Sequence, residues 1–179
     1  LYRNHGDGTF TEVTEKAGIR APGWSSSAAF ADFDGDGHLD LYVAAYLDVG
    51  PDALPEGRAG GTCSYVGAPV LCGPRGLPGA RDLHFHNNGD GTFTEQSEAS
   101  GASDEKRYFG LGVVTADVDG DRDLDIYVGN DATPNYLFVN RGNGRFDERG
   151  FESGTAVSGD GNEQASMGVD AADFDNDGR

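Results

Sequence analysis

The sequence DVDGDRDLD at residues 117–125 places a carboxylate at every second position of one short stretch. A near copy, DFDGDGHLD, occupies residues 32–40, and a third copy, DFDNDGR, occupies residues 173–179. Carboxylates this close together repel one another, and a bound cation relieves that repulsion. Hard oxygen donors at this density are the ligands that Ca²⁺ prefers. The three stretches therefore predict a repeat protein that binds calcium once per repeat, and the alternative is a metal-free acidic surface hairpin.

The predicted ligands follow from the positions within each loop. Carboxylates at positions 1, 3, 5 and 9 are assigned as side-chain ligands, and the residue at position 7 is assigned through its backbone carbonyl. The assigned residues are Asp32, Asp34, Asp36, His38 and Asp40; then Asp117, Asp119, Asp121, Asp123 and Asp125; and, in a partial third site, Asp173, Asp175 and Asp177. An EF-hand would need a Glu at position 12, where this chain has Val43 and Val128. At position 6, a left-handed backbone would cost Arg122 about 1 kcal/mol relative to glycine.

A second repeated element alternates with the acidic loops. Residues 1–12, 84–95 and 137–148 align without gaps around a turn of Gly-Asp-Gly or Gly-Asn-Gly. Alternation of apolar and polar residues predicts four short strands per unit, with the acidic loop between strands A and B and the glycine turn between C and D. The predicted strands are A at 25–33, 110–118 and 167–174; B at 39–46 and 124–129; C at 1–4, 84–87 and 136–140; and D at 9–14, 92–97 and 145–149. The Asp-Gly and Asn-Gly pairs predict two-residue hairpins between C and D.

Four antiparallel strands per period of about 50 residues are typical of a β-propeller blade. The predicted fold class is therefore all-β, with the chain forming a partial propeller. It would hold a half blade at 1–19, a blade at 24–102 enlarged by an insertion at about 48–82, a normal blade at 108–155, and the start of another at 165–179. Because propellers have roughly four to eight blades, we expect either a segment of a longer polypeptide or a subunit whose blades are completed by further copies.

These motifs resemble the FG-GAP/VCBS repeat proteins, and among them the bacterial group similar to cartilage acidic protein. The resemblance rests on FADFDGDGHLDLYVAAY at 30–46, TADVDGDRDLDIYVGN at 115–130, SMGVDAADFDNDG at 166–178 and the NxGDGTFTE turns. It implies an integrin-α-like propeller with calcium in the A–B hairpins, at the aspartates assigned above. It also implies an extracellular, cell-surface or periplasmic location and a role in binding, adhesion or scaffolding.

The insertion at 48–82 holds both cysteines and five of the seven prolines. A loop of this length without secondary structure is often functional. A disulfide between Cys63 and Cys72 is the natural interpretation in an exported protein, and paired free thiols or a metal site are the alternatives. The strand order places the insertion on the face opposite the calcium loops. We expect a recognition loop with Tyr65, Arg75 and Arg81 as ligand contacts, or else structural packing against a neighbouring blade.

Two histidines could form a metal pair, because His84 and His86 lie on one face of a predicted strand. The aligned residues in the next repeat are Leu137 and Val139, which favours a structural role for both histidines.

The net charge of −18 excludes long-range attraction to nucleic acid or to an anionic membrane. No apolar run is long enough to span a bilayer, so membrane insertion is not expected. The sequence shows no nucleophile elbow, phosphate loop or dinucleotide fingerprint, which favours a non-enzymatic role. The expected partner is a protein or glycan ligand or further copies of the assembly. A carbohydrate-active lyase or dehydratase and a self-assembling structural subunit are the alternatives.

Overall fold

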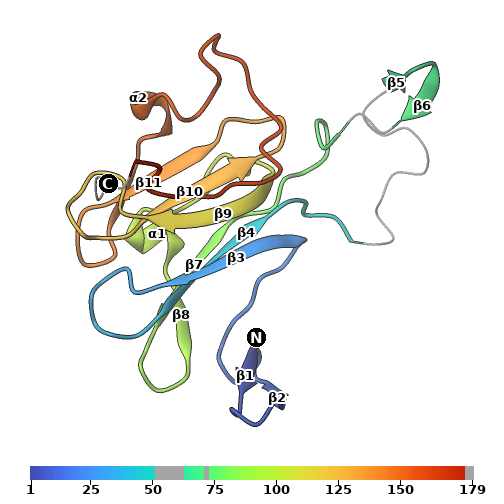
Figure 1. Ribbon diagram of the computed structural model, residues 1–179. Helices are drawn as coiled ribbons and strands as arrows, with labels where there is room; N and C mark the ends of the chain where they lie inside the picture. The colour runs from blue at the N-terminus through green and yellow to red at the C-terminus, as the bar shows by residue number, and fades with distance from the viewer. Residues whose placement is uncertain (51–62, 71–72, 176–179) are drawn as a thin grey trace.

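The computed structural model describes residues 1–50, 63–70 and 73–175 (Figure 1). Two four-stranded antiparallel sheets make up most of it, with strand orders β3–β4–β7–β8 and β9–β10–β11–β12. Two separate hairpins, β1–β2 and β5–β6, complete the strands of the described residues. The strand bounds are β1 Tyr2–Asn4, β2 Phe10–Glu12, β3 Ser25–Ala31, β4 Asp40–Ala45, β5 Cys63–Tyr65, β6 Ala68–Val70, β7 Leu83–Asn87, β8 Phe93–Glu95, β9 Gly110–Ala116, β10 Asp125–Asn130, β11 Tyr136–Asn140 and β12 Phe146–Glu148.

Each four-stranded sheet has the A–B–C–D order of a propeller blade. Neighbouring strands pair antiparallel in chain order, with the β5–β6 hairpin inserted between β4 and β7, so each sheet is a meander. The second strand of each blade, β4 or β10, is largely buried because the sheet and its neighbour cover it. The structure therefore confirms the predicted all-β fold and the partial propeller. The N-terminal residues form the antiparallel hairpin β1–β2, and its assignment to strands C and D of a further blade stays a prediction.

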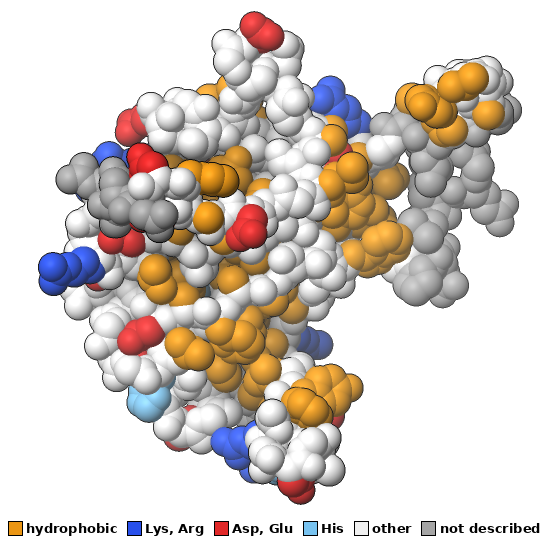
Figure 2. Space-filling model, viewed as in Figure 1, with side chains coloured by type: hydrophobic (Ala, Val, Ile, Leu, Met, Phe, Trp, Pro, Cys, Tyr) orange, Lys and Arg blue, Asp and Glu red, His pale blue; other side chains and the backbone are white. Residues whose placement is uncertain are grey.

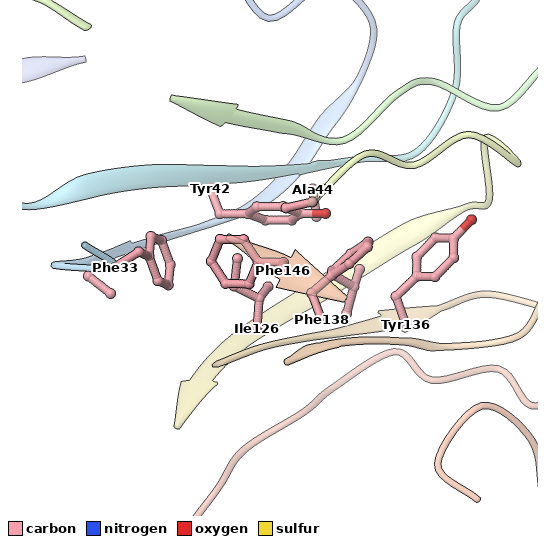
Figure 3. Packing of buried hydrophobic residues seen from close by; sticks show 10 residues of the cluster. Phe33, Tyr42, Ala44, Ile126, Tyr136, Phe138 and Phe146 are labelled. Carbon is pink, nitrogen blue, oxygen red and sulfur yellow. The ribbon is translucent and has the colours of Figure 1, made fainter. Parts of the chain in front are cut away.

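The hydrophobic core lies between the two blades (Figure 3). Phe33 and Tyr42 from the first blade face Ile126, Phe138 and Phe146 from the second, and all five are at least 95% buried. Phe33 and Phe146 meet edge to face with ring centroids 5.5 Å apart. Because the main core belongs to neither sheet alone, the two blades stabilise each other.

Hydrophobic side chains are uncovered beside β3 and the β1–β2 hairpin (Figure 2). Tyr2 is 67% exposed and Phe10 is 59% exposed on the hairpin, and Phe30 on β3 is 47% exposed. In a closed propeller these faces would pack against neighbouring blades.

The secondary structure differs from the predictions in three places. Residues 167–174 form no strand among the described residues; just before them, Ala165 forms an isolated bridge with Asp131. A strand needs a neighbour paired along its edge, whereas Val169 of this segment packs over Gly112 of β9 and Gly129 of β10. The insertion, expected to lack secondary structure, contains the β5–β6 hairpin. Two short helices, α1 Ser97–Ser100 and α2 Gly150–Ser153, follow the outer strands and were not predicted.

The turns between strands C and D are also longer than predicted. In the first of them the backbone N–H of His5 donates to the carbonyl of Thr9, which encloses three residues rather than two. Gly6 and Gly8 take left-handed φ values of 81° and 89°, whereas the Asp7 between them does not. The side chain of Asp7 accepts a hydrogen bond from the Thr9 backbone N–H at 2.9 Å, which stabilises the larger loop.

Candidate metal centres and an inter-blade cleft

The two complete acidic loops fold through their own carboxylates. The carboxylate at position 1 accepts hydrogen bonds from the backbone N–H groups three and five residues further on, at 2.9 and 3.0 Å for Asp32 and at 2.7 and 2.9 Å for Asp117. The carboxylates at positions 3 and 5 each accept from the N–H group two residues on; these are Asp34, Asp36, Asp119 and Asp121. These local bonds give the two loops the same backbone path.

The backbone at position 6 is left-handed in both loops. Its φ is +85° at Gly37 and +81° at Arg122. Arg122 therefore adopts a left-handed backbone conformation, which costs free energy for a residue with a side chain but not for glycine.

The carboxylate at position 9 joins three strands. Asp40 and Asp125 are 0% and 1% exposed. One oxygen of each accepts from the backbone N–H just after strand A, at 3.3 Å for Asp40 and 2.8 Å for Asp125. The other oxygen accepts from the last N–H of strand C, that of Asn87 at 2.8 Å or Asn140 at 2.7 Å. This residue therefore ties the acidic loop to its own blade.

Burial raises the pKa of both position-9 carboxyls. The pKa of Asp40 is raised further by the charge of Asp34, and that of Asp125 by the charges of Asp119 and Asp121. Each loop also brings several carboxylates close together, and the backbone N–H groups that bond to them leave their formal negative charges in place. A divalent cation would offset this charge, so the residues present fit calcium.

The donor atoms that converge differ between the two loops. In the second loop, single oxygens of Asp117, Asp119 and Asp125 lie within 4.8 Å of one another. In the first loop the group within that distance is Asp34, Asp36 and an imidazole nitrogen of His86. Asp32 and Asp121 lie in the same loops outside these compact groups. His38 and Asp123, assigned through their carbonyls, stand at the ends of the loops just before strand B.

The third predicted loop is described only in part. Asp173 and Asp175 are exposed, and Asp177 lies outside the described residues. Its predicted partial site stays a prediction.

The two histidines of strand β7 have different environments. His84 is fully buried between the rings of Phe33 and Phe146, and its Nδ1 lies 2.9 Å from the Ser100 hydroxyl. Burial lowers the pKa of His84 to about 4, so it is neutral at physiological pH. The structural role expected for His84 therefore fits its position, but His86 lies beside carboxylates of the first acidic loop. His86 stands opposite Asp40, one residue beyond the last backbone pair of β4 and β7, Leu41 with Phe85. Only strand pairing, which the sequence does not state, could have indicated this.

The opposite face holds a cleft of about 810 Å³ between the blades. The D–A connection of the first blade and the B–C connection of the second form it, so it lies at the ends of the strands away from the acidic loops. Its lining mixes cations, acids and aromatic rings: Arg81, Lys106, Arg107, Glu98, Asp104, Glu105, Glu148, Tyr108, Tyr136 and Phe151. The predicted insert-side face is therefore hollowed where the blades meet.

Two buried acids lie at this inter-blade region. Asp104 is fully buried and accepts hydrogen bonds from the hydroxyl of Tyr136 at 2.6 Å and the backbone N–H of Tyr108 at 3.2 Å, while its Oδ2 makes no hydrogen bond. Asp82 is 1% exposed and accepts from Tyr42 at 3.2 Å and the Ala45 N–H at 2.7 Å. Burial raises the pKa of both carboxyls, and the charge of Asp104 raises that of Asp82 further.

The structure separates the three residues predicted as ligand contacts. Arg81 lines the large cleft, and Arg75 lines an adjoining cavity of about 390 Å³ that shares Pro134 and Phe151 with it. Arg75 forms an ion pair with Glu163 at 2.5 Å. Tyr65 lies on the β5–β6 hairpin, 73% exposed and apart from both cavities. Cys63 begins β5, whereas Cys72 lies outside the described residues, so the predicted disulfide stays a prediction.

The fold and the paired acidic hairpins define a segment of a repeat β-propeller. Consistent with this, the FG-GAP-like repeat family matches residues 1–43, 78–128 and 117–179, and the chain belongs to that family. The matched segments leave out residues 44–77, which cover most of the predicted insertion.

Among known proteins, the chain is similar to cartilage acidic protein 1. It is 31% identical to the human protein over 159 residues, covering 72% of this chain and 24% of that protein. It is 30% identical to the mouse protein over 200 residues, covering 93% of this chain and 30% of that protein. The chain thus spans less than a third of the length of these relatives. No helix among the described residues is both long and apolar enough to cross a membrane.

Proposed function

We propose that this chain is part of a calcium-stabilised extracellular β-propeller that serves as a binding or scaffold module. The observation that carries the proposal is the buried position-9 carboxylate, which occurs in both complete loops with the same two backbone partners. An ion bound beside it would neutralise the loop and hold strands A, B and C in one arrangement. Extracellular calcium modules bind with Kd values of about 0.1–1 mM, which matches the free calcium outside cells.

Calcium removal tests this function. A chelator should lower the melting temperature in scanning calorimetry, because the carboxylates would then repel one another without a counter-ion. Added Ca²⁺ should restore the original value, and titration calorimetry should detect binding at the two complete hairpins. An unchanged melting temperature in chelator would contradict the calcium assignment.

The inter-blade cleft is the proposed ligand surface, and its expected occupant is a protein segment. Its mixture of exposed charges around aromatic rings suits a peptide, and the free Oδ2 of Asp104 lies at a buried point of the cleft wall. The proposal predicts that Lys106→Glu abolishes ligand binding at an unchanged melting temperature, and that Glu15→Lys, on the N-terminal side of the first blade, does not. A variant lacking residues 50–80 that folds and keeps every ligand would contradict a recognition role for the insertion.

A carbohydrate-active enzyme is the second candidate, because Arg81, Lys106, Tyr108 and Tyr136 converge on this cleft. A lyase would need one of them as a base. Burial and the neighbouring Asp104 raise the pKa of Tyr136, and burial raises that of Tyr108, so both tyrosines are poor bases at neutral pH. The binding module remains the function that the geometry supports better.

A structural subunit is the third candidate, favoured by the exposed Tyr2 and Phe10 of the two-stranded β1–β2 hairpin. If copies complete one another's blades, light scattering should show assemblies that Tyr2→Ser with Phe10→Ser dissociates. Monomers at all concentrations would exclude this candidate.

A further inference from the structure

We propose that the first acidic hairpin is a mixed nitrogen and oxygen metal site, in which His86 supplies an imidazole ligand. It would then select Zn²⁺ or a similar transition-metal ion, whereas the second hairpin would remain an all-oxygen calcium site. The inference rests on the proposed metal-binding role of the hairpins and deepens it.

The position of His86 carries the proposal. Its Nδ1 lies 3.2 Å from Oδ2 of Asp34 and 3.1 Å from Oδ1 of Asp40. The same side chain belongs to the compact donor group with Asp34 and Asp36. The imidazole is 28% exposed, so an ion can reach it from solvent. Carboxylates and an imidazole converging from one loop and a neighbouring strand form a donor set that suits zinc.

The second hairpin provides an internal comparison. In both blades the backbone N–H of the asparagine at the end of strand C donates to the position-9 carboxylate. The Nδ2 group of that asparagine donates to the carbonyl of the residue just before the position-9 aspartate, which is Leu39 or Leu124. These matching bonds align Asn87 with Asn140, and therefore His86 with Val139. In each blade, the residue before the asparagine lies one residue beyond the last backbone pair of strands B and C, opposite the position-9 aspartate.

The two sites therefore differ at one ligand position. Val139 is buried and has no donor atom. Ca²⁺ prefers hard oxygen ligands, whereas imidazole favours zinc, copper and nickel. The histidine should shift the preference of the first site without altering the path of its loop.

The competing role for His86 is that of a hydrogen-bond donor to the loop. An Nδ1–H held between Asp34 and Asp40 would bond to their carboxylates, and the first loop would then need no metal. The two roles predict opposite effects of removing the ring.

The experiment is a metal titration of the metal-free full chain with Zn²⁺ and with Ca²⁺ separately. It compares the original protein with His86→Val, which copies the second hairpin, and with Val139→His, which copies the first. His5→Ala serves as the control, because His5 is an exposed histidine in the turn of the β1–β2 hairpin, outside both acidic loops. Nitrogen NMR of the histidine rings identifies the ring that binds zinc.

We expect one Zn²⁺ site that His86→Val weakens at least tenfold and His5→Ala leaves unchanged, with a zinc-dependent shift of Nδ1 of His86. Val139→His should create a second zinc site. Equal zinc affinity in the original protein and His86→Val would overturn the inference, as would a gain in calcium affinity in His86→Val without any zinc site. If the second hairpin also fails to bind Ca²⁺, the proposed function itself fails; if it binds Ca²⁺ normally, only the role of His86 is refuted.

Discussion

At the scale of single residues, the two complete acidic loops have the same geometry although their sequences differ. The left-handed position 6 is Gly37 in one loop and Arg122 in the other, with φ values of +85° and +81°. The second loop therefore has backbone strain at position 6 that the first loop lacks. Substitutions at this position in the two loops measure what that strain costs in stability.

Replacing Arg122 with glycine should stabilise the calcium-bound protein by about 0.5–1 kcal/mol, because the removed left-handed strain exceeds the added entropy of the unfolded chain. Urea unfolding in saturating Ca²⁺ measures the change. Gly37→Arg is the reciprocal variant and should destabilise by a similar amount. A loss of stability in Arg122→Gly would show that the guanidinium contributes more than the strain costs.

The buried acids Asp82 and Asp104 should make stability depend on pH. Their raised pKa values mean that the folded state holds a proton that the unfolded state releases above about pH 4. The pair's contribution to stability is therefore fully present below that pH and is lost as the pH rises through the folded-state pKa. Asp82→Asn should remove this loss, so its stability relative to the original protein should rise from pH 4 to pH 8.

Thermal unfolding of both proteins across that range measures this difference. Asp160→Asn changes an exposed carboxylate, so its melting temperature should change with pH in the same way as that of the original protein. A constant difference between Asp82→Asn and the original protein would mean that the pair is fully ionised in the fold.

At the scale of elements, the A–B hairpin is stabilised by two kinds of bond. Some carboxylates only shape the loop, whereas the position-9 aspartate also accepts backbone N–H groups from two other segments of the blade. A metal ligand and a structural acceptor can therefore be told apart by substitution.

Asp125→Asn should destabilise the protein by about 1–3 kcal/mol even in chelator, because the amide leaves one buried N–H facing its NH₂ group. Asp121→Asn, at an exposed position of the same loop, should weaken calcium binding and leave the chelated protein at least as stable as before, because one repelling carboxylate is removed. Chemical unfolding with and without Ca²⁺ separates the two effects. Equal stability of both variants in chelator would reduce Asp125 to a metal ligand alone.

At the scale of the whole molecule, the core between the blades makes them one cooperative unit. Phe138 lies in the second blade, is fully buried and contacts Tyr42 of the first blade, with ring centroids 6.2 Å apart. A substitution that destabilises one blade should therefore also lower the stability of the other.

Phe138→Ala should cost about 3–5 kcal/mol, the usual loss for a buried phenylalanine. Trp24, the single tryptophan, precedes β3 in the first blade, so its fluorescence reports a change made in the second blade. In Phe138→Ala, the unfolding midpoint measured by Trp24 fluorescence should decrease by the same amount as the midpoint measured by circular dichroism. Phe151→Ala, at a residue 64% exposed, should have little effect. If Phe138→Ala left the unfolding midpoint measured by Trp24 fluorescence unchanged, the two blades would unfold separately.

Features whose causes lie within a few residues could be predicted from the sequence. The acidic loops, the glycine turns and most strands were predicted because carboxylate spacing, left-handed glycine positions and alternating hydrophobicity are local properties. Residues 167–174 were one exception, because a strand depends on a partner as well as on its own pattern. The contacts between side chains of different strands and blades came from the folded structure alone. It placed His86 beside Asp40 and His84 in the core, although both lie on one strand, and it brought Arg81 and Asp104 to one cleft. Strand register and blade packing set those contacts, and both arise from burial of the whole core rather than from any single stretch of sequence.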